Sequence, residues 1–474
     1  MTRTFGKDLT VGSIPRTLIR FAVPIFLGNL LSSGYAIINT VWVGQLLGGN
    51  AVAAVAVSFP VFLLMIALCA GATTATSVLV AQNYGARRDG EIQRVVDTSW
   101  TLAILLTVVI TAAGLLGAGW LIDLMGTPPA VRPMAIGYLR LSFAGFASLY
   151  TSFLGMSTLR AIGNTRLPLL FVVLGTTLNA ILDPLLILGL GPFPRMGLNG
   201  AATASLVSGA IAAATGFVYT MWKYRHSPIY PRRLALDPGL VRRIAGIGFP
   251  SFVQQSLFSF AMAVITSLVN RFGPDATASF GITGRIDTLV ALPAMAVLTS
   301  VSTVTAQNLG AGKPERIPQV FRWGLVINTP VIALVSLVCF LAPGFVMRLF
   351  VHDPAIVAIG VGYFRYVGWG YVFLILPYVS NGVIIGSGKT AVTMMISFVS
   401  LCIVRLPLAT WLSHTSLRLE GVWLAILIGF PINAALGYAY YLSGKWKRTA
   451  VLAQAGGGAK PGDGDDGGGS LMVG

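Results

Sequence analysis

The chain has few charged residues for its length. Only 10% of its 474 residues are charged, whereas 55% are apolar. Its mean hydropathy of +0.80 lies far above the range of water-soluble domains, so the chain could not present a normal polar surface on all sides. We therefore expect lipid to be its solvent.

Cysteine and histidine are also scarce, which argues against a metal site or a disulfide framework. The three cysteines lie in apolar runs, where we expect them to pack, and the three histidines lie singly in predicted loops or near the ends of apolar runs. The chain contains no phosphate-binding Gly-x-x-x-x-Gly-Lys-Ser/Thr segment, which excludes an ATP engine of that type within it. We expect no metal, no organic cofactor and no enzymatic activity, because clusters of His, Cys or acidic residues at one surface are missing.

Long apolar runs dominate what the sequence does contain. A helix needs about 20 apolar residues to cross a bilayer, and twelve runs meet that need. The prediction is an all-α membrane protein with twelve transmembrane helices. Its spans are placed near 17–40, 52–76, 96–118, 136–157, 167–188, 200–221, 245–269, 281–304, 321–342, 357–382, 391–412 and 421–442.

The basic residues are unevenly distributed between the two sides of the predicted membrane. The chain has 32 Lys and Arg against 15 Asp and Glu, and most of the bases lie in segments on the amino-terminal side. Because such residues favour the cytoplasmic side, we expect both termini in the cytoplasm and a multi-pass protein of the cell (inner) membrane. The net charge of +17 then reflects contact with lipid headgroups, and nucleic acid is not an expected partner. The opposite side has only Arg132, Arg195, Arg271, Arg348 and Arg418.

The two halves of the chain repeat each other at a shift of 225 residues. Six spans per half is an even number, so both halves enter the membrane from the same side. They are therefore expected to form two six-helix bundles related by a pseudo-two-fold axis along the membrane normal. Four landmarks carry the repeat: Ala81-Gln82-Asn83-Tyr84-Gly85-Ala86 with Ala306-Gln307-Asn308-Leu309-Gly310-Ala311, Gly137-Tyr138-Leu139-Arg140 with Gly362-Tyr363-Phe364-Arg365, Gly163-Asn164-Thr165 with Gly388-Lys389-Thr390, and, at a nearly identical shift, Pro24-Ile25-Phe26 with Pro250-Ser251-Phe252.

The predicted domains follow from this repeat. The Ala-Gln-Asn-x-Gly-Ala motif is interpreted first as a helix exit, with a moving gate as the alternative. The arginines of the Gly-Tyr-x-Arg landmark are expected to reach lipid headgroups. The divisions are a cytoplasmic tail at 1–16, a first bundle at 17–221, a cytoplasmic linker at 222–243, a second bundle at 244–448 and a disordered Gly-rich tail at 449–474.

Two acidic residues fall inside predicted spans, where a charge costs about 2.5 to 3.5 kcal/mol and needs a cavity or a partner. Asp183 lies in the fifth span, with Asn179 one helical turn earlier and Pro184 beside it. Their carboxylate, amide oxygen and freed carbonyl could hold a proton or a hard cation. We interpret Asp183 as a coupling site, with a structural hydrogen-bond hub as the alternative.

The eighth and eleventh spans carry the other buried charges. Arg405 occupies the stretch of the second half that corresponds to Asp183 in the first. It is interpreted either as a transport residue or as a buried partner of Asp287. Arg285 and Asp287 lie two residues apart on different faces of one helix, so they need not pair.

Across residues 15–448, the chain resembles the multidrug and toxic compound extrusion family, and most of all its prokaryotic DNA-damage-inducible-protein-F-like branch. The resemblance implies a V-shaped pair of bundles and alternating access. It also implies export of amphipathic, often cationic, organic compounds in exchange for protons or sodium ions. Besides the repeat and the paired motif, it rests on Leu-Arg-Ala-Ile-Gly-Asn-Thr at 159–165, Asn-Ala-Ile-Leu-Asp-Pro at 179–184 and Arg-Leu-Pro-Leu at 405–408.

The resemblance also implies roles for particular residues. Asp183 and Asn179 match the family's coupling residues, and Thr203 fits a nearby hydroxyl. Asn39 stands where relatives commonly have an aspartate; an amide cannot titrate, but its oxygen could serve sodium. Exchange of a single ion is then the simplest expectation, unless coupling uses the acid of the eighth span. The substrate cavity is expected to include Tyr35, Arg285, Asp287 and Arg405.

The predicted function is that of a secondary active antiporter, which works as a monomer and exports small organic compounds in exchange for H⁺ or Na⁺. A flippase for lipid-linked oligosaccharides, or a metabolite exporter of the same superfamily, is the alternative. A flippase would be expected to have a more basic cavity than Arg285 and Arg405 supply. A receptor or channel would leave the acid of one half and the base of the other unexplained.

Overall fold

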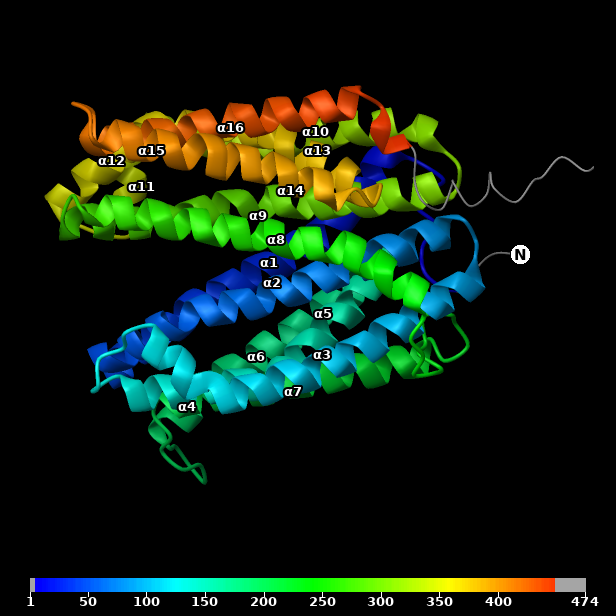
Figure 1. The fold of residues 1–474 in the computed structure, drawn as a ribbon, viewed down its shortest axis with the longest axis horizontal. Helices are drawn as coiled ribbons and strands as arrows, with labels where there is room; N and C mark the ends of the chain where they lie inside the picture. Colours follow the sequence, from blue (N-terminus) through cyan, green and yellow to red (C-terminus); the bar gives the residue numbers. More distant parts are fainter. Residues whose placement is uncertain (1–4, 448–474) are drawn as a thin grey trace, which may run out of the picture.

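The computed structural model describes residues 5–447, and within this range it is built of helices without any strand (Figure 1). This confirms the predicted all-α membrane fold. The predicted Gly-rich tail at 449–474 lies outside the described residues. The helices of the first half are α1 (Ile14–Leu47), α2 (Gly49–Gly85), α3 (Asp89–Leu124), α4 (Arg132–Ala144), α5 (Phe146–Ala161), α6 (Arg166–Leu188) and α7 (Leu198–Lys223).

The second half contains more and shorter elements, because several of its spans are interrupted. Its α-helices are α8 (Pro238–Asn270), α9 (Pro274–Gly310), α10 (Ile317–Leu341), α11 (Pro343–Arg348), α12 (Pro354–Gly370), α13 (Ile375–Gly386), α14 (Thr390–Phe398), α15 (Leu406–Ser413) and α16 (Arg418–Leu442). Three short 3₁₀ segments, η1 (Pro314–Arg316), η2 (Tyr371–Leu374) and η4 (Lys445–Lys447), and one π-helical segment, η3 (Val399–Arg405), complete the half.

Within the described residues, eleven helices are long and apolar enough to cross a membrane. The remaining predicted span, the fourth at 136–157, is divided between α4 and α5, which meet at Gly145. Glycine is a poor helix former, and the Gly145 backbone leaves the regular helix at φ −74° and ψ −7°. Its carbonyl accepts a hydrogen bond from the Ser148 hydroxyl at 2.8 Å, which stabilises the break.

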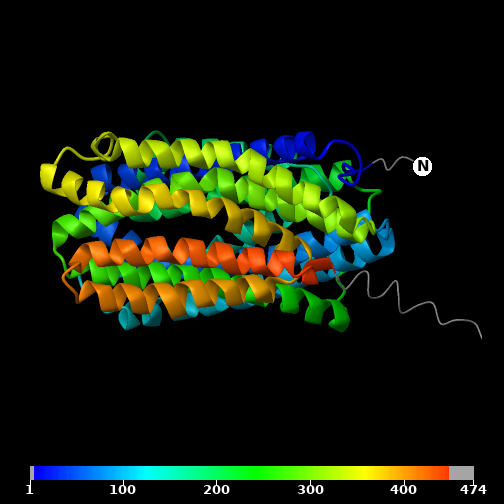
Figure 2. The same ribbon diagram turned by 90° about the horizontal axis from the view of Figure 1, so that it is seen from above.

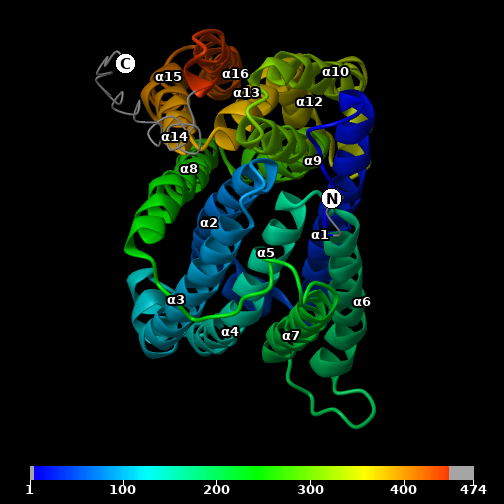
Figure 3. The same cartoon turned by 90° about the vertical axis from the view of Figure 1, so that its right-hand side faces the viewer.

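The helices form two bundles, α1–α7 and α8–α16, that diverge like a V (Figure 1). A view turned by 90° shows the long helices running nearly parallel to the long axis of the molecule (Figure 2). The bundles meet at the end that carries the start of α1, the ends of α2 and α9, and the linker (Figure 3). We call this the basic end, because the Arg- and Lys-rich segments 87–94, 223–243 and 313–322 lie there.

The apolar cores explain why the bundles join at one end only. Toward the opposite end, each bundle packs on itself: the first around Leu139 and Phe146, the second around Phe364 and Trp423. These four side chains are at most 1% exposed. The two separate cores leave the bundles free to diverge there.

At the basic end, each core contains residues of both halves. The beginning of α1, with Leu18 and Phe21, packs against Val301 and Val383 of the second bundle. The beginning of α8 packs reciprocally among residues of α2, α3 and α5. The first helix of each half therefore crosses to the other bundle, so the contacts at this end do not follow the predicted domain boundaries.

The connection between the halves is shorter than the predicted linker at 222–243, because α8 begins at Pro238 and the irregular stretch is 224–237. The Asp237 carboxylate caps α8, accepting bonds from the backbone N–H groups of Gly239 at 2.9 Å and Leu240 at 3.1 Å. These two donors, with the Arg94 guanidinium, hold the pKa of Asp237 below its usual value. The linker crosses the basic end of the first bundle (Figure 3).

Candidate functional site

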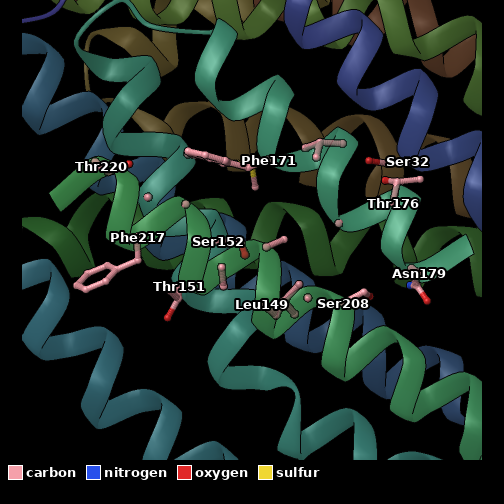
Figure 4. A pocket seen from close by; sticks show the side chains of 18 of the residues that line it. Ser32, Leu149, Thr151, Ser152, Phe171, Thr176, Asn179, Ser208, Phe217 and Thr220 are labelled. Carbon is pink, nitrogen blue, oxygen red and sulfur yellow. The ribbon is translucent and has the colours of Figure 1, made fainter. Parts of the chain in front are cut away.

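The first bundle contains a partly open cavity of about 310 Å³ between α1, α3, α5, α6 and α7 (Figure 4). None of the residues that line it, all in the described part of the chain, is acidic or basic. Hydroxyl groups alternate with aromatic and small side chains, so the wall can accept both apolar surface and hydrogen bonds. The polar lining comprises Ser32, Tyr35, Thr151, Ser152, Thr176, Asn179, Ser205, Ser208 and Thr220; Trp100, Phe171 and Phe217 add aromatic surface.

Asp183 lies directly behind the wall of this cavity. Its side chain is fully buried, at 0% exposed, but Tyr35, which lines the cavity and bonds to the acid, connects it to that space. The Tyr35 hydroxyl donates to Oδ2 of Asp183. Asn39 Nδ2 donates to the same oxygen at 2.6 Å and to the Tyr35 hydroxyl at 3.1 Å. The acid is therefore one side chain away from the cavity.

The Asn39 side chain turns its amide nitrogen toward the acid. The reason is electrostatic, since a carboxylate attracts an N–H donor and repels a second oxygen. Asn39 stabilises the charged form of Asp183. That its amide oxygen serves sodium stays a prediction.

Three buried oxygen atoms on α6 and α7 have no hydrogen-bond donor among the described residues: Oδ1 of Asp183, Oδ1 of Asn179 and Oγ1 of Thr203. Asn179 is held in place through its other amide atom, which donates to Ser205 Oγ at 3.2 Å. Buried polar atoms are usually paired, so these oxygens are candidates to bind a proton or a hard cation. Asp183 and Asn179 lie on α6 and Thr203 lies on α7, the helix packed against it.

A second acid, Asp287, lies in the other bundle and is held by two tyrosines. Tyr363 donates to its Oδ2 at 2.5 Å, and Tyr371 donates to its Oδ1. Tyr371 begins η2, the 3₁₀ break between α12 and α13. Both oxygens of this carboxylate are therefore occupied, whereas Asp183 has one oxygen free.

Arg405 makes no ion pair within 4 Å with Asp287 in the described structure, but the two charges interact electrostatically at longer range. Its guanidinium lies 5.1 Å from the centre of the Phe430 ring and donates weakly to the carbonyl of Ile426 at 3.4 Å. The guanidinium fits here because residue 429 is a glycine: a Cβ at Gly429 would come within 2.7 Å of Nε of Arg405. Arg405 ends the π-helical segment η3, a type of helix irregularity that is frequent at functional sites.

The residues predicted to line one substrate cavity do not lie together in the structure. Arg285 is exposed and, as expected, makes no ion pair with Asp287 in the described structure. It also does not line the cavity of the first bundle. The predicted set Tyr35, Arg285, Asp287 and Arg405 is therefore divided between the two bundles, and of these only Tyr35 lines the described cavity.

Sequence reasoning missed the tyrosines of the second bundle and Ser205. Tyr363 belongs to the repeated Gly-Tyr-x-Arg landmark, which we interpreted through its arginine. Its counterpart in the first bundle, Tyr138, interacts electrostatically with Asp183. The landmark therefore places a tyrosine near the acid of each bundle. The repetition of this tyrosine in the two halves was the sequence signal that could have identified it.

Comparison with known proteins agrees with this architecture. The MatE family model matches residues 24–185 and again residues 250–411, once in each bundle. The probable multidrug resistance protein YpnP of Bacillus subtilis (strain 168) is 29% identical, over 94% of this chain and 99% of its own. The FAD transporter of Shewanella oneidensis is 28% identical, over 91% of this chain and 94% of its own.

A solved structure is also similar over nearly the whole fold. It is described as the outward-facing conformation of a multidrug resistance MATE family transporter of the MOP superfamily. The likeness has a TM-score of 0.88 at 26% identity and covers 95% of this chain and 100% of that one. Since a duplicated family model, full-length relatives and the V-shaped pair of bundles agree, the chain is a multi-pass membrane transporter of the multidrug efflux type and belongs to the multidrug and toxic compound extrusion (MATE) family.

Proposed function

We propose that this transporter is a secondary active antiporter, which exports an amphipathic organic compound in exchange for a cation, H⁺ or Na⁺, carried at Asp183. The single observation that supports this best is the state of that acid. It is fully buried, has no basic partner among the described residues, keeps one oxygen free and lies one side chain behind an uncharged cavity.

The neighbours of Asp183 indicate how ion binding would act. When the acid is charged, Tyr35 and Asn39 donate to one of its oxygens and partly offset the cost of burial. A proton or sodium ion that binds at the free oxygen removes the remaining negative charge. The bundle can then rearrange without an uncompensated charge in an apolar environment. Ion binding in this scheme favours the release of the exported compound.

The energy for export comes from the ion gradient. When a neutral compound is exchanged for one cation, one elementary charge crosses the membrane and supplies about 2.3 kcal/mol at 100 mV. When the exported compound itself carries one positive charge, one-for-one exchange moves no net charge, and the concentration gradient of the ion alone drives export. By the positive-inside rule, we expect the basic end to face the cytoplasm and the protein to lie in the cell membrane. The V then opens outward, which agrees with the outward-facing description of the similar structure. Closing that side and opening the basic end would complete alternating access.

The cavity wall indicates the class of compound. Aromatic and small side chains accept flat apolar surface, and the hydroxyls supply hydrogen bonds without a fixed charge. This composition suits amphipathic compounds, neutral or cationic, with the acid behind the wall as counter-charge. A metabolite exporter is the second candidate, because one full-length relative is named an FAD transporter. An anionic nucleotide would find no basic side chain in this wall.

Reconstituted vesicles test the antiport directly. Efflux of a fluorescent cationic dye is measured with a proton gradient and a sodium gradient imposed separately, and FAD is added as a competitor. We expect Asp183→Asn to reduce gradient-driven efflux to the level of empty vesicles. Asp275→Asn, at an exposed acid of α9, is the matched control and should be fully active. Undiminished efflux by the Asp183 variant would overturn the assignment, and strong competition by FAD would favour the second candidate.

A further inference from the structure

The repeated Ala-Gln-Asn-x-Gly-Ala motif has no part in the site described above, yet the structure brings its two copies together. α2 ends at Gly85 and α9 ends at Gly310, within the two copies. Residues just beyond both helix ends take left-handed conformations, with φ 58° at Arg87 and φ 69° at Gly312. The helix-exit interpretation is therefore correct as a description of local structure.

The glutamines of the motif do more than end their own helices. Gln82 in the first bundle donates through Nε2 to the backbone carbonyl of Gly386 in the second, at 2.9 Å. Gln307 in the second bundle donates to the backbone carbonyl of Ala161 in the first, at 2.8 Å. Donor and acceptor are each shifted by 225 residues between the two bonds. The pair is thus a reciprocal, two-fold contact between the bundles.

The glycines of the motif make the same contact possible. A Cβ at Gly85 would overlap the backbone carbonyl of Gln307, and a Cβ at Gly310 would overlap that of Gln82. Any other residue at either position would push the two helix ends apart, because backbone atoms cannot yield as a flexible side chain can. The two glycines let the ends of α2 and α9 cross with backbone against backbone.

The asparagines and the surroundings hold this crossing in place. Asn83 and Asn308 each donate to a carbonyl one turn earlier on their own helix, at 2.9 Å and 2.7 Å. Gln82 is 2% exposed, and Gln307 and Asn308 are 0% exposed. The crossing lies between the two mixed cores of the basic end, where water does not compete for the hydrogen bonds.

The amino-terminal segment adds contacts that break the two-fold symmetry. The backbone N–H of Leu9 donates to Oε1 of Gln307 at 3.0 Å, and the N–H of Lys7 donates to the carbonyl of Ile162 at 2.7 Å. Residues just before α1 therefore fasten the end of α5 in the first bundle to the end of α9 in the second.

We propose that the two copies of the motif form the gate that closes the basic end. Gln82 and Gln307 hold the bundles in register, and Gly85 and Gly310 set their distance. This assignment rests on the proposed antiport, because a gate has meaning only if the basic end opens during transport. Opening would break both glutamine hydrogen bonds at once. Because the freed groups would then bond to water, the net cost of opening is small and the gate can close again.

Hydrogen–deuterium exchange of the full-length protein tests the gate without substrate or ion gradient. A buried hydrogen bond contributes about 1 kcal/mol net, so we expect Gln82→Ala to raise the opening equilibrium about five-fold. Because a gate opens as a unit, exchange should accelerate at the end of α2 and also at the end of α9 in the other bundle. Gln307→Ala should likewise accelerate exchange at both helix ends, and the two changes together should accelerate it more than either change alone. Gln319→Ala, at an exposed glutamine of α10, is the control and should change neither end.

The glycine contact has its own matched pair of variants. Gly85→Ala should accelerate exchange at both helix ends more than either glutamine variant does. Gly90→Ala, where a Cβ would meet nothing within 4 Å, should have no such effect. If Gly85→Ala does not fold, the glutamine variants still decide the question. If exchange accelerates only in the substituted helix, the motif merely ends its helices and the proposed gate is wrong. That result would not depend on whether Asp183 is needed for gradient-driven efflux.

Discussion

At the scale of single residues, the two bundles hold their membrane acids differently. Asp183 has two donors on one oxygen and none on the other. Asp287 has one tyrosine on each oxygen. A carboxylate with a free oxygen can bind a cation without first breaking a hydrogen bond, so the first bundle is the better place for reversible ion binding.

The substitution Asn39→Asp tests this difference. Its new carboxylate would replace an amide nitrogen that lies 2.6 Å from Oδ2 of Asp183. Two carboxylates this close cannot both stay ionised, so one of them keeps its proton to higher pH. We expect the pH for half-maximal efflux to rise by about one to two units, and protons moved per dye molecule to rise from one toward two. Both are measured in vesicles from proton and dye fluxes.

Asn270→Asp, at the exposed end of α8, serves as the control for added charge. An unchanged pH profile and stoichiometry in the Asn39 variant would place ion binding elsewhere, with Asp287 as the next residue to test.

At the scale of elements, the sequence predicted the spans far better than their partners. Hydropathy located α4 and α5 together as one span, but the break at Gly145 depends on a local hydroxyl contact that a pattern of apolar residues does not carry. The same limit applies to α1. Its apolar run predicts a helix in lipid. The run does not show which bundle the first turns of α1 contact, because that depends on side chains about 280 positions away in sequence, such as Val301 in the same core as Phe21.

The segment before α1 should respond to acid. Burial alone would raise the pKa of Asp8, but hydrogen bonds from Thr10 and the charges of Arg87 and Lys313 hold that pKa below its usual 3.8. A lowered pKa in the folded state means that the carboxylate stabilises the segment above the usual pKa and loses this effect as pH falls through the lowered value. Exchange protection of residues 5–13, corrected for the intrinsic rate, should stay constant from about pH 7 to about pH 4 and then decrease.

Asp8→Asn supplies the comparison, since an amide does not titrate in this range. The decrease should be absent in that variant. An equal decrease in both proteins would mean that the acid has no part in holding the segment.

At the scale of the whole molecule, the duplicated architecture was the most predictable feature, because a repeat with a fixed shift is visible in one sequence. The acid of the site was also predictable, since an apolar span rarely keeps a charge such as Asp183. The tyrosine partners of Asp287 and the orientation of the Asn39 amide were not. They depend on how helices rotate against each other, and an amide can turn either end toward a neighbour.

The mixed cores predict that neither half is stable alone. A chain cut within the linker, after the 74% exposed Leu234, gives the parts 1–234 and 235–474. Each part alone would expose the apolar residues that normally meet the other half at the basic end, so we expect it to be degraded. Expressed together, the two parts should co-purify after extraction in mild detergent and should retain dye efflux.

The measurement is affinity capture through a tag on one part only. Recovery of either half in quantity without the other would contradict the importance of the shared cores.

The reciprocal glutamine bonds also bear on ancestry. One six-helix chain that carried a single Gln, a single Gly and a single acceptor carbonyl would form both bonds by pairing with an identical copy, since each subunit supplies a donor to its partner. Gene fusion would then have preserved a homodimer interface inside one polypeptide. After fusion, the sequences of the two copies could diverge. One half then kept the aspartate Asp183, and the corresponding stretch of the other half acquired Arg405.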